Sequence, residues 1–176
     1  MLKFREKVAY GLGDTASNIV FQTVMLYLAF FYTDVFGISP VFVGTMFLAV
    51  RIIDAITDPL MGAIADRTQT KYGKFRPYLL WFALPFGLIS VLAFTTPDFT
   101  ETGKMWYAFL TYTALMMVYT AINIPYCALG GVLTADPQER VSVQSYRFVC
   151  AFIGGLLVSA LTLPLVDYFG AGDKAK

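Results

Sequence analysis

The sequence predicts an all-α membrane protein with five transmembrane helices. Hydrophobic residues make up 57% of its 176 residues, whereas charged residues make up only 14%, below the roughly 25% of an average soluble domain. Four apolar stretches carry no charge over about 18 residues or more, the length that crosses the hydrocarbon core of a bilayer. These stretches are residues 15–33, 78–97, 105–135 and 148–166. A fifth, residues 40–65, is apolar but contains three charged side chains.

In chain order, the expected spans are residues 8–32, 40–65, 78–94, 105–133 and 145–168 of a single domain, 1–176. Ser39 and Pro40 suit the start of the second span, because a hydroxyl residue followed by proline is typical of a helix amino terminus. Placing the amino terminus in the cytoplasm puts eight lysines and arginines in cytoplasmic segments and three outside. The positive-inside rule therefore favours that orientation.

Composition excludes several kinds of site. The chain has no histidine, so an imidazole proton relay and a histidine metal site are excluded, and we expect no cofactor. Both cysteines lie in apolar spans and are interpreted as buried thiols. The apolar runs argue against a nucleic-acid partner. Because five helices do not easily enclose a polar pathway, we interpret the chain as an incomplete bundle whose carboxy-terminal half is missing. A genuine five-span protein is the alternative.

Five ionisable side chains lie inside the expected spans, where such groups usually face a cavity or a partner. They are Asp14, Arg51, Asp54, Asp58 and Arg147. Their formal charges sum to −1, so one carboxylate lacks a fixed partner. It can be protonated, neutralised by a bound cation, or shielded by water. The first two states are those that a proton- or sodium-coupled carrier requires.

Asp54 and Asp58 are the strongest candidates for a cation site. Their i, i+4 spacing places both on one helix face, about 6 Å apart along the axis. A sodium ion between them would relieve their repulsion, and Thr57 and Thr120 offer nearby hydroxyls. Arg51 lies on about the same face, three residues before Asp54. The alternative is a cluster of ion pairs that only locks helices together.

Two further spans carry polar rows that suit a sugar. Asp14, Asn18 and Gln22 recur every four residues in the first span, and helix packing through amides is the alternative. Thr120, Asn123 and Cys127 share a face in the fourth span, where Pro125 predicts a kink and Tyr119 and Tyr126 flank it. Amides bind hydroxyls and aromatic faces cover a pyranose, although ordinary packing around a kink is the alternative. Arg147 can fork onto hydroxyls or carboxylates or extend to the interface.

Two sequence motifs resemble those of known transporters. Gly62-x-x-x-Asp66-Arg67 followed by Lys71-x-Gly73-Lys74-x-Arg76 resembles the loop between the second and third helices of the major facilitator superfamily. The string Arg51-Ile-Ile-Asp54-Ala-Ile-Thr-Asp58-Pro59 is more specific. Together with Tyr10-Gly-Leu-Gly13, Phe31-Tyr32-Thr33-Asp34-Val35, Tyr119-Thr120 and Ile124-Pro125, it resembles the glycoside–pentoside–hexuronide:cation symporter family of melibiose permease.

The resemblance covers the whole chain and implies five helices of a major facilitator-type amino-terminal six-helix bundle. It implies a cation site at Asp54, Asp58, Thr57 and Thr120, where Thr57 replaces an asparagine of melibiose permease. It also implies a sugar site at Asn18, Tyr119, Asn123, Cys127 and Arg147. Asn18 and Asn123 replace sugar-binding aspartates, and Cys127 replaces a tryptophan, so a sugar other than melibiose is expected. Gating or salt-bridge roles are expected for Asp14, Arg51, Asp66, Arg67, Lys74 and Arg76.

These observations together predict a bacterial inner-membrane symporter rather than an enzyme. The expected partners are the lipid bilayer and a small sugar or glycoside, and the expected coupling cation is Na⁺ or H⁺. A phospholipid-headgroup transferase is disfavoured, because the third span has no acidic residue. The remaining alternative is a truncated, non-transporting membrane remnant or an assembly partner.

Overall fold

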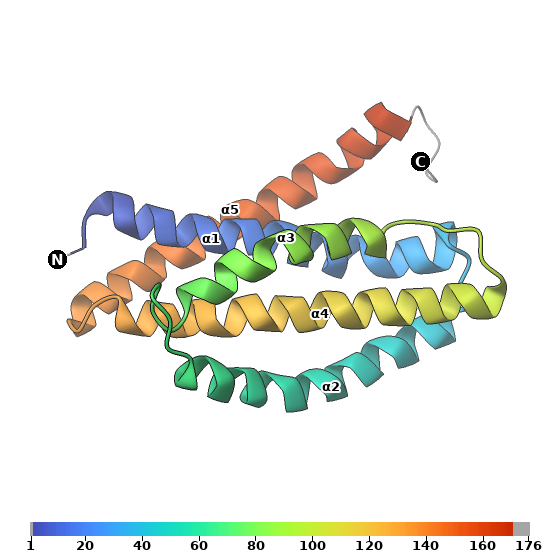
Figure 1. Cartoon of the computed structure of the whole chain (residues 1–176). Coiled ribbons are helices and arrows are strands. Elements are labelled where there is room, and N and C mark those ends of the chain that lie inside the picture. Colours follow the sequence, from blue (N-terminus) through green and yellow to red (C-terminus); the bar gives the residue numbers. More distant parts are fainter. Residues whose placement is uncertain (1, 171–176) are drawn as a thin grey trace. The chain divides into compact units, whose positions relative to one another are not determined.

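The computed structural model describes residues 2–170, and all regular structure in that range is helical (Figure 1). The α-helices are α1 (Phe4–Thr23), α2 (Pro40–Arg67), α3 (Arg76–Ala93), α4 (Glu101–Val132) and α5 (Pro137–Gly170). Two π-helical segments, η1 (Val24–Leu28) and η2 (Phe31–Val35), follow α1. The all-α class predicted from composition is therefore confirmed.

The count of five spans needs a correction. Four helices, α2 to α5, are long and apolar enough to cross a membrane. The first expected span, residues 8–32, does not form one such helix. Its α-helical part, α1, begins among the charged residues Arg5, Glu6 and Lys7 and also contains Asp14. The apolar continuation from Val24 is π-helical instead.

Proline and glycine set several helix boundaries. Pro40 occupies the first turn of α2, as its position after Ser39 predicted. At the start of α5, the carboxylate of Asp136 accepts a hydrogen bond from the backbone N–H of Gln138 at 2.9 Å, which satisfies one of the amide groups that a helix end leaves unpaired. The loop between α2 and α3 turns at Gly73, whose φ of 94° is a conformation that favours glycine.

The described residues divide into two compact units. The first, here called the α1/α5 unit, comprises residues 2–30 and 130–170. The second, here called the α2–α4 unit, comprises residues 31–129 and contains most of α4.

In the α1/α5 unit, two helices that are distant in sequence lie side by side (Figure 1). Near the start of α1, Phe4 packs edge-on against Tyr146 of α5. Further along both helices, the Thr15 hydroxyl donates to the Cys150 carbonyl at 2.8 Å. The order of these contacts shows that the two helices run parallel. Glycine permits this close approach. A Cβ at Gly154 would lie only 3.0 Å from the Thr15 carbonyl oxygen.

In the α2–α4 unit, aromatic and aliphatic side chains join the helices. Ala65, Phe75 and Tyr78 form a small core against which side chains of α2, α3 and α4 pack. Further along, the rings of Phe47 and Tyr112 lie 4.8 Å apart, so α2 also meets α4 there. The opposite side of α2 is exposed and carries an aliphatic row at four-residue spacing. This row consists of Leu48, Ile52, Ile56, Leu60 and Ile64.

Candidate functional site

The acid pair predicted on α2 lies away from the exposed aliphatic row of that helix. Asp54 continues the buried row of Met46 and Val50, and only 7% of its surface is exposed. Asp58, one turn later, is half-buried. The helix therefore turns its carboxylates toward the interior of the α2–α4 unit and its aliphatic side chains outward.

The two carboxylates have different partners. Arg51 approaches Asp54, with 3.3 Å between Nη1 and Oδ2. The other Asp54 oxygen, Oδ1, is buried without a hydrogen-bond partner in the described part of the chain. Asp58 instead accepts a hydrogen bond from the Thr120 hydroxyl of α4 at 2.8 Å, and no lysine or arginine within residues 2–170 forms an ion pair with it. Within the described residues, Arg51 is thus an ion-pair partner of Asp54 and not of Asp58.

This arrangement offers oxygen ligands of the kind that a monovalent cation uses. Buried carboxylate oxygens without partners are costly, and a hard cation prefers oxygen ligands of the kind that Asp54, Asp58 and Thr120 supply. Thr57 lies beside them, but its hydroxyl is 3.5 Å from the Asp54 backbone carbonyl and points along its own helix. Its predicted role as a ligand therefore stays a prediction.

A second charged pair joins the helices of the α1/α5 unit. Arg147 Nε lies 2.9 Å from Asp14 Oδ2, and the two side chains are 17% and 6% exposed. Gln144, one turn earlier on α5, accepts a longer hydrogen bond from Arg147 Nη1 at 3.4 Å. The Asn18 amide donates to the Asp14 backbone carbonyl at 3.0 Å. Asp14, expected to act in gating, and Arg147, expected to bind sugar, are therefore direct partners.

The five residues predicted to bind sugar are divided between the units. Asn18 and Arg147 belong to the α1/α5 unit. Tyr119, Asn123 and Cys127 belong to the α2–α4 unit, where the Cys127 thiol lies 3.7 Å from the Asn123 side-chain oxygen and Tyr119 packs against Phe86. Their roles stay predictions. Pro125 lies within α4, which continues to Val132.

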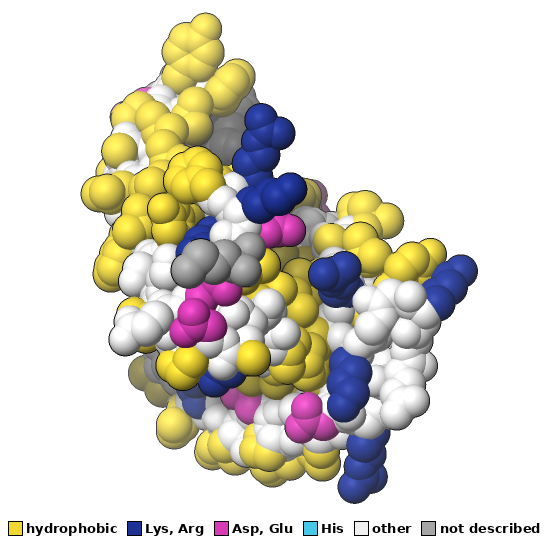
Figure 2. All heavy atoms as spheres, turned by 90° about the vertical axis from the view of Figure 1, so that its left-hand side faces the viewer, with side chains coloured by type: hydrophobic (Ala, Val, Ile, Leu, Met, Phe, Trp, Pro, Cys, Tyr) yellow, Lys and Arg dark blue, Asp and Glu magenta, His cyan; other side chains and the backbone are white. Residues whose placement is uncertain are grey.

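The end of α2, the loop after it and the start of α3 carry four of the residues expected to have gating or salt-bridge roles. Asp66, Arg67, Lys74 and Arg76 are all exposed, and none of them forms an ion pair within residues 2–170. Figure 2 shows Lys and Arg side chains standing out from a surface that is largely hydrophobic and uncharged. Their gating or salt-bridge roles remain predictions.

Glu139, in the first turn of α5, is a buried charge that the sequence analysis missed. It accepts hydrogen bonds from the Thr134 hydroxyl at 2.8 Å and from the Leu2 backbone N–H, and Lys7 Nζ lies 3.9 Å away. The Thr134 hydroxyl, more than any other group, lowers the pKa of the Glu139 carboxyl from its ordinary value. The only available signal was its position after the Asp136-Pro137 helix start.

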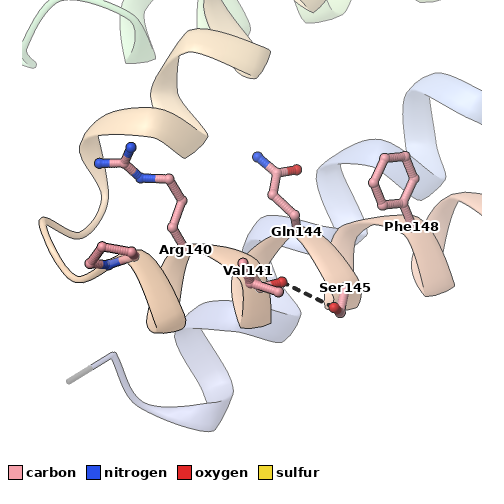
Figure 3. Close-up of a pocket in the computed structure, with 6 residues that line it drawn as sticks. Arg140, Val141, Gln144, Ser145 and Phe148 are labelled. Carbon is pink, nitrogen blue, oxygen red and sulfur yellow. Dashed lines mark hydrogen bonds between the residues drawn. The ribbon is translucent and has the colours of Figure 1, made fainter.

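Gln144 is the second residue that the sequence analysis missed. Besides its bond to Arg147, it lines a groove of about 400 Å³ along α5 (Figure 3). The other lining residues are Pro137, Arg140, Val141, Ser145 and Phe148. Gln144 is thus the link between this groove and the buried ion pair.

Comparisons with known proteins agree with the resemblance. The sequence model of a family described as MFS/sugar transport protein matches residues 9–176. The chain is 58% identical to the inner membrane symporter YicJ of Escherichia coli strain K12 over 174 residues, which cover 99% of this chain and 38% of that protein. It is 55% identical to the putative glycoside/cation symporter YagG of the same strain, over 98% of this chain and 38% of that protein.

A glucuronide carrier protein homolog, also from Escherichia coli strain K12, is 38% identical over 94% of this chain and 36% of its own length. The chain thus spans less than two fifths of the length of these relatives. The match over nearly the whole chain, with four helices able to cross a membrane, establishes that this is a multi-pass membrane protein belonging to the MFS/sugar transport protein family, a family of transporters.

Proposed function

We propose that the chain forms the amino-terminal part of a symporter that carries a sugar or glycoside together with Na⁺ or H⁺. In this proposal the protein lies in the bacterial inner membrane with its amino terminus in the cytoplasm. The names of its relatives include both glycoside and glucuronide carriers, so they leave the charge of the substrate open.

The observation that carries the proposal is the imbalance of charge on α2. Asp54 is paired with Arg51, whereas Asp58 bonds to the Thr120 hydroxyl and has no ion-pair partner within residues 2–170. An anion inside a membrane protein requires a compensating positive charge or a proton. A cation that binds beside Asp58 supplies that charge, and its binding then favours the conformation that accepts sugar. Linkage makes the effect reciprocal, so sugar also raises the affinity for the cation.

The test joins this whole chain to the carboxy-terminal part of YicJ that lies beyond the match, and measures sugar uptake into proteoliposomes. We expect a sodium or proton gradient to stimulate the uptake of at least one neutral sugar. Asp58→Asn should remove the stimulation, because it removes the uncompensated charge. Asp98→Asn, a change in an exposed loop, is the matched control and should leave the stimulation intact.

The alternative, a non-transporting remnant or assembly partner, predicts a different result. In that case the fused protein inserts into membranes but takes up no sugar with either gradient. Uptake that persists unchanged in Asp58→Asn would instead refute the cation site while leaving sugar transport in place. The two parts of the proposal can therefore fail separately.

A further inference from the structure

The ion pair between α1 and α5 has a consequence for the substrate. We propose that Asp14 is a specificity-determining residue, which restricts the transporter to uncharged sugars by balancing the charge of Arg147. This inference rests on the proposed function, because it names the class of sugar that the same protein accepts. Asp14 acts through Arg147 and is a positioning residue rather than a sugar ligand.

The geometry shows that the charges of Asp14 and Arg147 are closely matched. Nε and Oδ2 are 2.9 Å apart, and the carboxylate is almost fully buried. A buried carboxylate beside a guanidinium is held by a charge-assisted hydrogen bond, which is stronger than a bond between neutral groups. The neighbouring groups that the structure shows bonded to the pair, the Gln144 and Asn18 amides, are uncharged. One carboxylate and one guanidinium have formal charges that sum to zero.

An anionic sugar meets an unfavourable balance at such a pair. To use the positive charge of Arg147, the carboxylate of a uronide must displace Asp14 or share the arginine with it. Displacement leaves Asp14 buried and unpaired, whereas sharing places two anions around one cation, and both cost free energy in a poorly solvated site. The arginine is therefore already committed to an anion that belongs to the protein.

An uncharged sugar does not face this cost. A guanidinium has five N–H donors and a carboxylate has lone pairs for several bonds, so hydroxyl groups can bond to the pair without separating its charges. The contrast with α2 is informative. There the unbalanced charge is negative, at Asp58, and it favours a cation. Neither the Asp14–Arg147 pair nor the Arg51, Asp54 and Asp58 group presents an unbalanced positive charge to an anionic sugar.

The experiment uses the fused protein and pairs of sugars that differ only in charge. Methyl glucoside and methyl galactoside are compared with the corresponding methyl uronides, and the ratio of uronide to glycoside uptake is measured. We expect the unaltered protein to take up the neutral member of a pair. Asp14→Asn should raise the ratio by about tenfold or more, because it exposes the charge of Arg147. Asp14→Asn combined with Arg147→Gln should bring the ratio back down.

Two further variants protect the test against misfolding. Gln144→Lys keeps Asp14 and adds a positive charge one turn from Arg147, so it should raise the ratio in the same direction. Asp167→Asn removes an exposed carboxylate from α5 and should leave the ratio unchanged. Immunoblotting of membranes verifies that each variant inserts.

Each outcome supports or overturns the inference. A raised ratio in Asp14→Asn or Gln144→Lys, with Asp167→Asn unchanged, supports it. Equal uptake of uronides and glycosides by the unaltered protein overturns it, as does an unchanged ratio in every inserted variant. A fused protein that takes up neither class of sugar refutes the proposed function itself, and the inference falls with it.

Discussion

In the α1/α5 unit Asp14 is paired with Arg147, whereas in the α2–α4 unit Arg51 is paired with Asp54 and Asp58 has no ion-pair partner within residues 2–170. Both sets of charges lie on helices whose exposed surfaces are largely apolar, so both must be compensated internally. The first set achieves this within the protein. The second does so only in part within residues 2–170, and we propose that a proton or a bound cation supplies the remaining charge. We therefore interpret the Asp14–Arg147 pair as a contact that stabilises the fold, and the Asp58 carboxylate as a group that can take part in transport.

The packing of helices around the two sets of charges also differs. Helices α1 and α5 approach so closely that Gly11 and Gly154 have no room for a Cβ without displacing a neighbour. Close backbone contact of this kind is how small residues join helices in membranes. The α2–α4 unit is joined instead by aromatic rings such as Phe47 and Tyr112. We therefore expect changes at the acid pair to affect transport first, and changes between α1 and α5 to affect stability first.

The largest effect should come from Thr120→Val, which removes the hydroxyl that bonds to Asp58. A hydrogen bond to a charged group contributes about 1.5–3 kcal/mol, so the concentration of cation for half-maximal uptake should rise about 10- to 100-fold. Uptake by the fused protein at graded cation concentrations measures it. Thr120→Ser keeps the hydroxyl and is the control. A shift of the same size in both variants would show that the methyl group, not the hydroxyl, is responsible.

A smaller effect is expected from Gly154→Ala, which tests the packing of the other unit. Its new methyl group would lie 3.0 Å from the Thr15 carbonyl oxygen, a backbone atom that cannot move aside cheaply. Overpacking typically costs about 1–3 kcal/mol, which exceeds the gain of up to about 1 kcal/mol when alanine replaces glycine in a helix. Thermal unfolding in detergent should therefore show a net loss of stability.

Gly155→Ala is the matched control for that change. A Cβ there would meet only the Gln22 side chain, at 3.6 Å or more, which is ordinary van der Waals contact. Its stability should be unchanged or slightly higher, because the helix propensity of alanine acts without a clash. Equal losses in both variants would contradict the comparison between the units, since the cost would then lie in the helix itself and not in its contact with α1.

Much of the fold could be predicted from the sequence because membrane helices are specified locally. Uncharged runs of sufficient length located α3, α4 and α5, and an apolar stretch that begins at the Ser39-Pro40 pair located α2. The first span differs from the expectation, because a charged start and a π-helical continuation divide a stretch that the apolar pattern alone treats as one helix. Amino-acid composition does not predict the change from α-helix to π-helix at Val24.

The candidate site was likewise predictable from the sequence only in part. Arg51, Asp54 and Asp58 were assigned to one helix face by their spacing, and the structure confirms the contact between the first two. Spacing in the sequence could not predict the Asp14–Arg147 pair, because its two members are 133 positions apart. Their contact depends on the close packing of two helices, which no local pattern encodes. The same holds for Glu139. Its partners include Leu2 and Lys7, near the amino terminus, as well as Thr134, just before α5.

The smallest effect concerns Glu139, which lies in the first turn of α5, ahead of the apolar run that begins near Ser145. Its carboxyl has a pKa below the ordinary value of 4.5, chiefly because the Thr134 hydroxyl bonds to it. A depressed pKa in the folded protein contributes stability above the unfolded pKa, and this contribution is lost as pH falls through the folded pKa. Thermal unfolding should therefore show that Glu139→Gln costs more stability at pH 7 than at a pH below 4.5.

Glu101→Gln, at an exposed position in the first turn of α4, provides the corresponding measurement in the other unit. A cost of Glu139→Gln that is equal at both pH values would mean that its hydrogen bonds act independently of its charge.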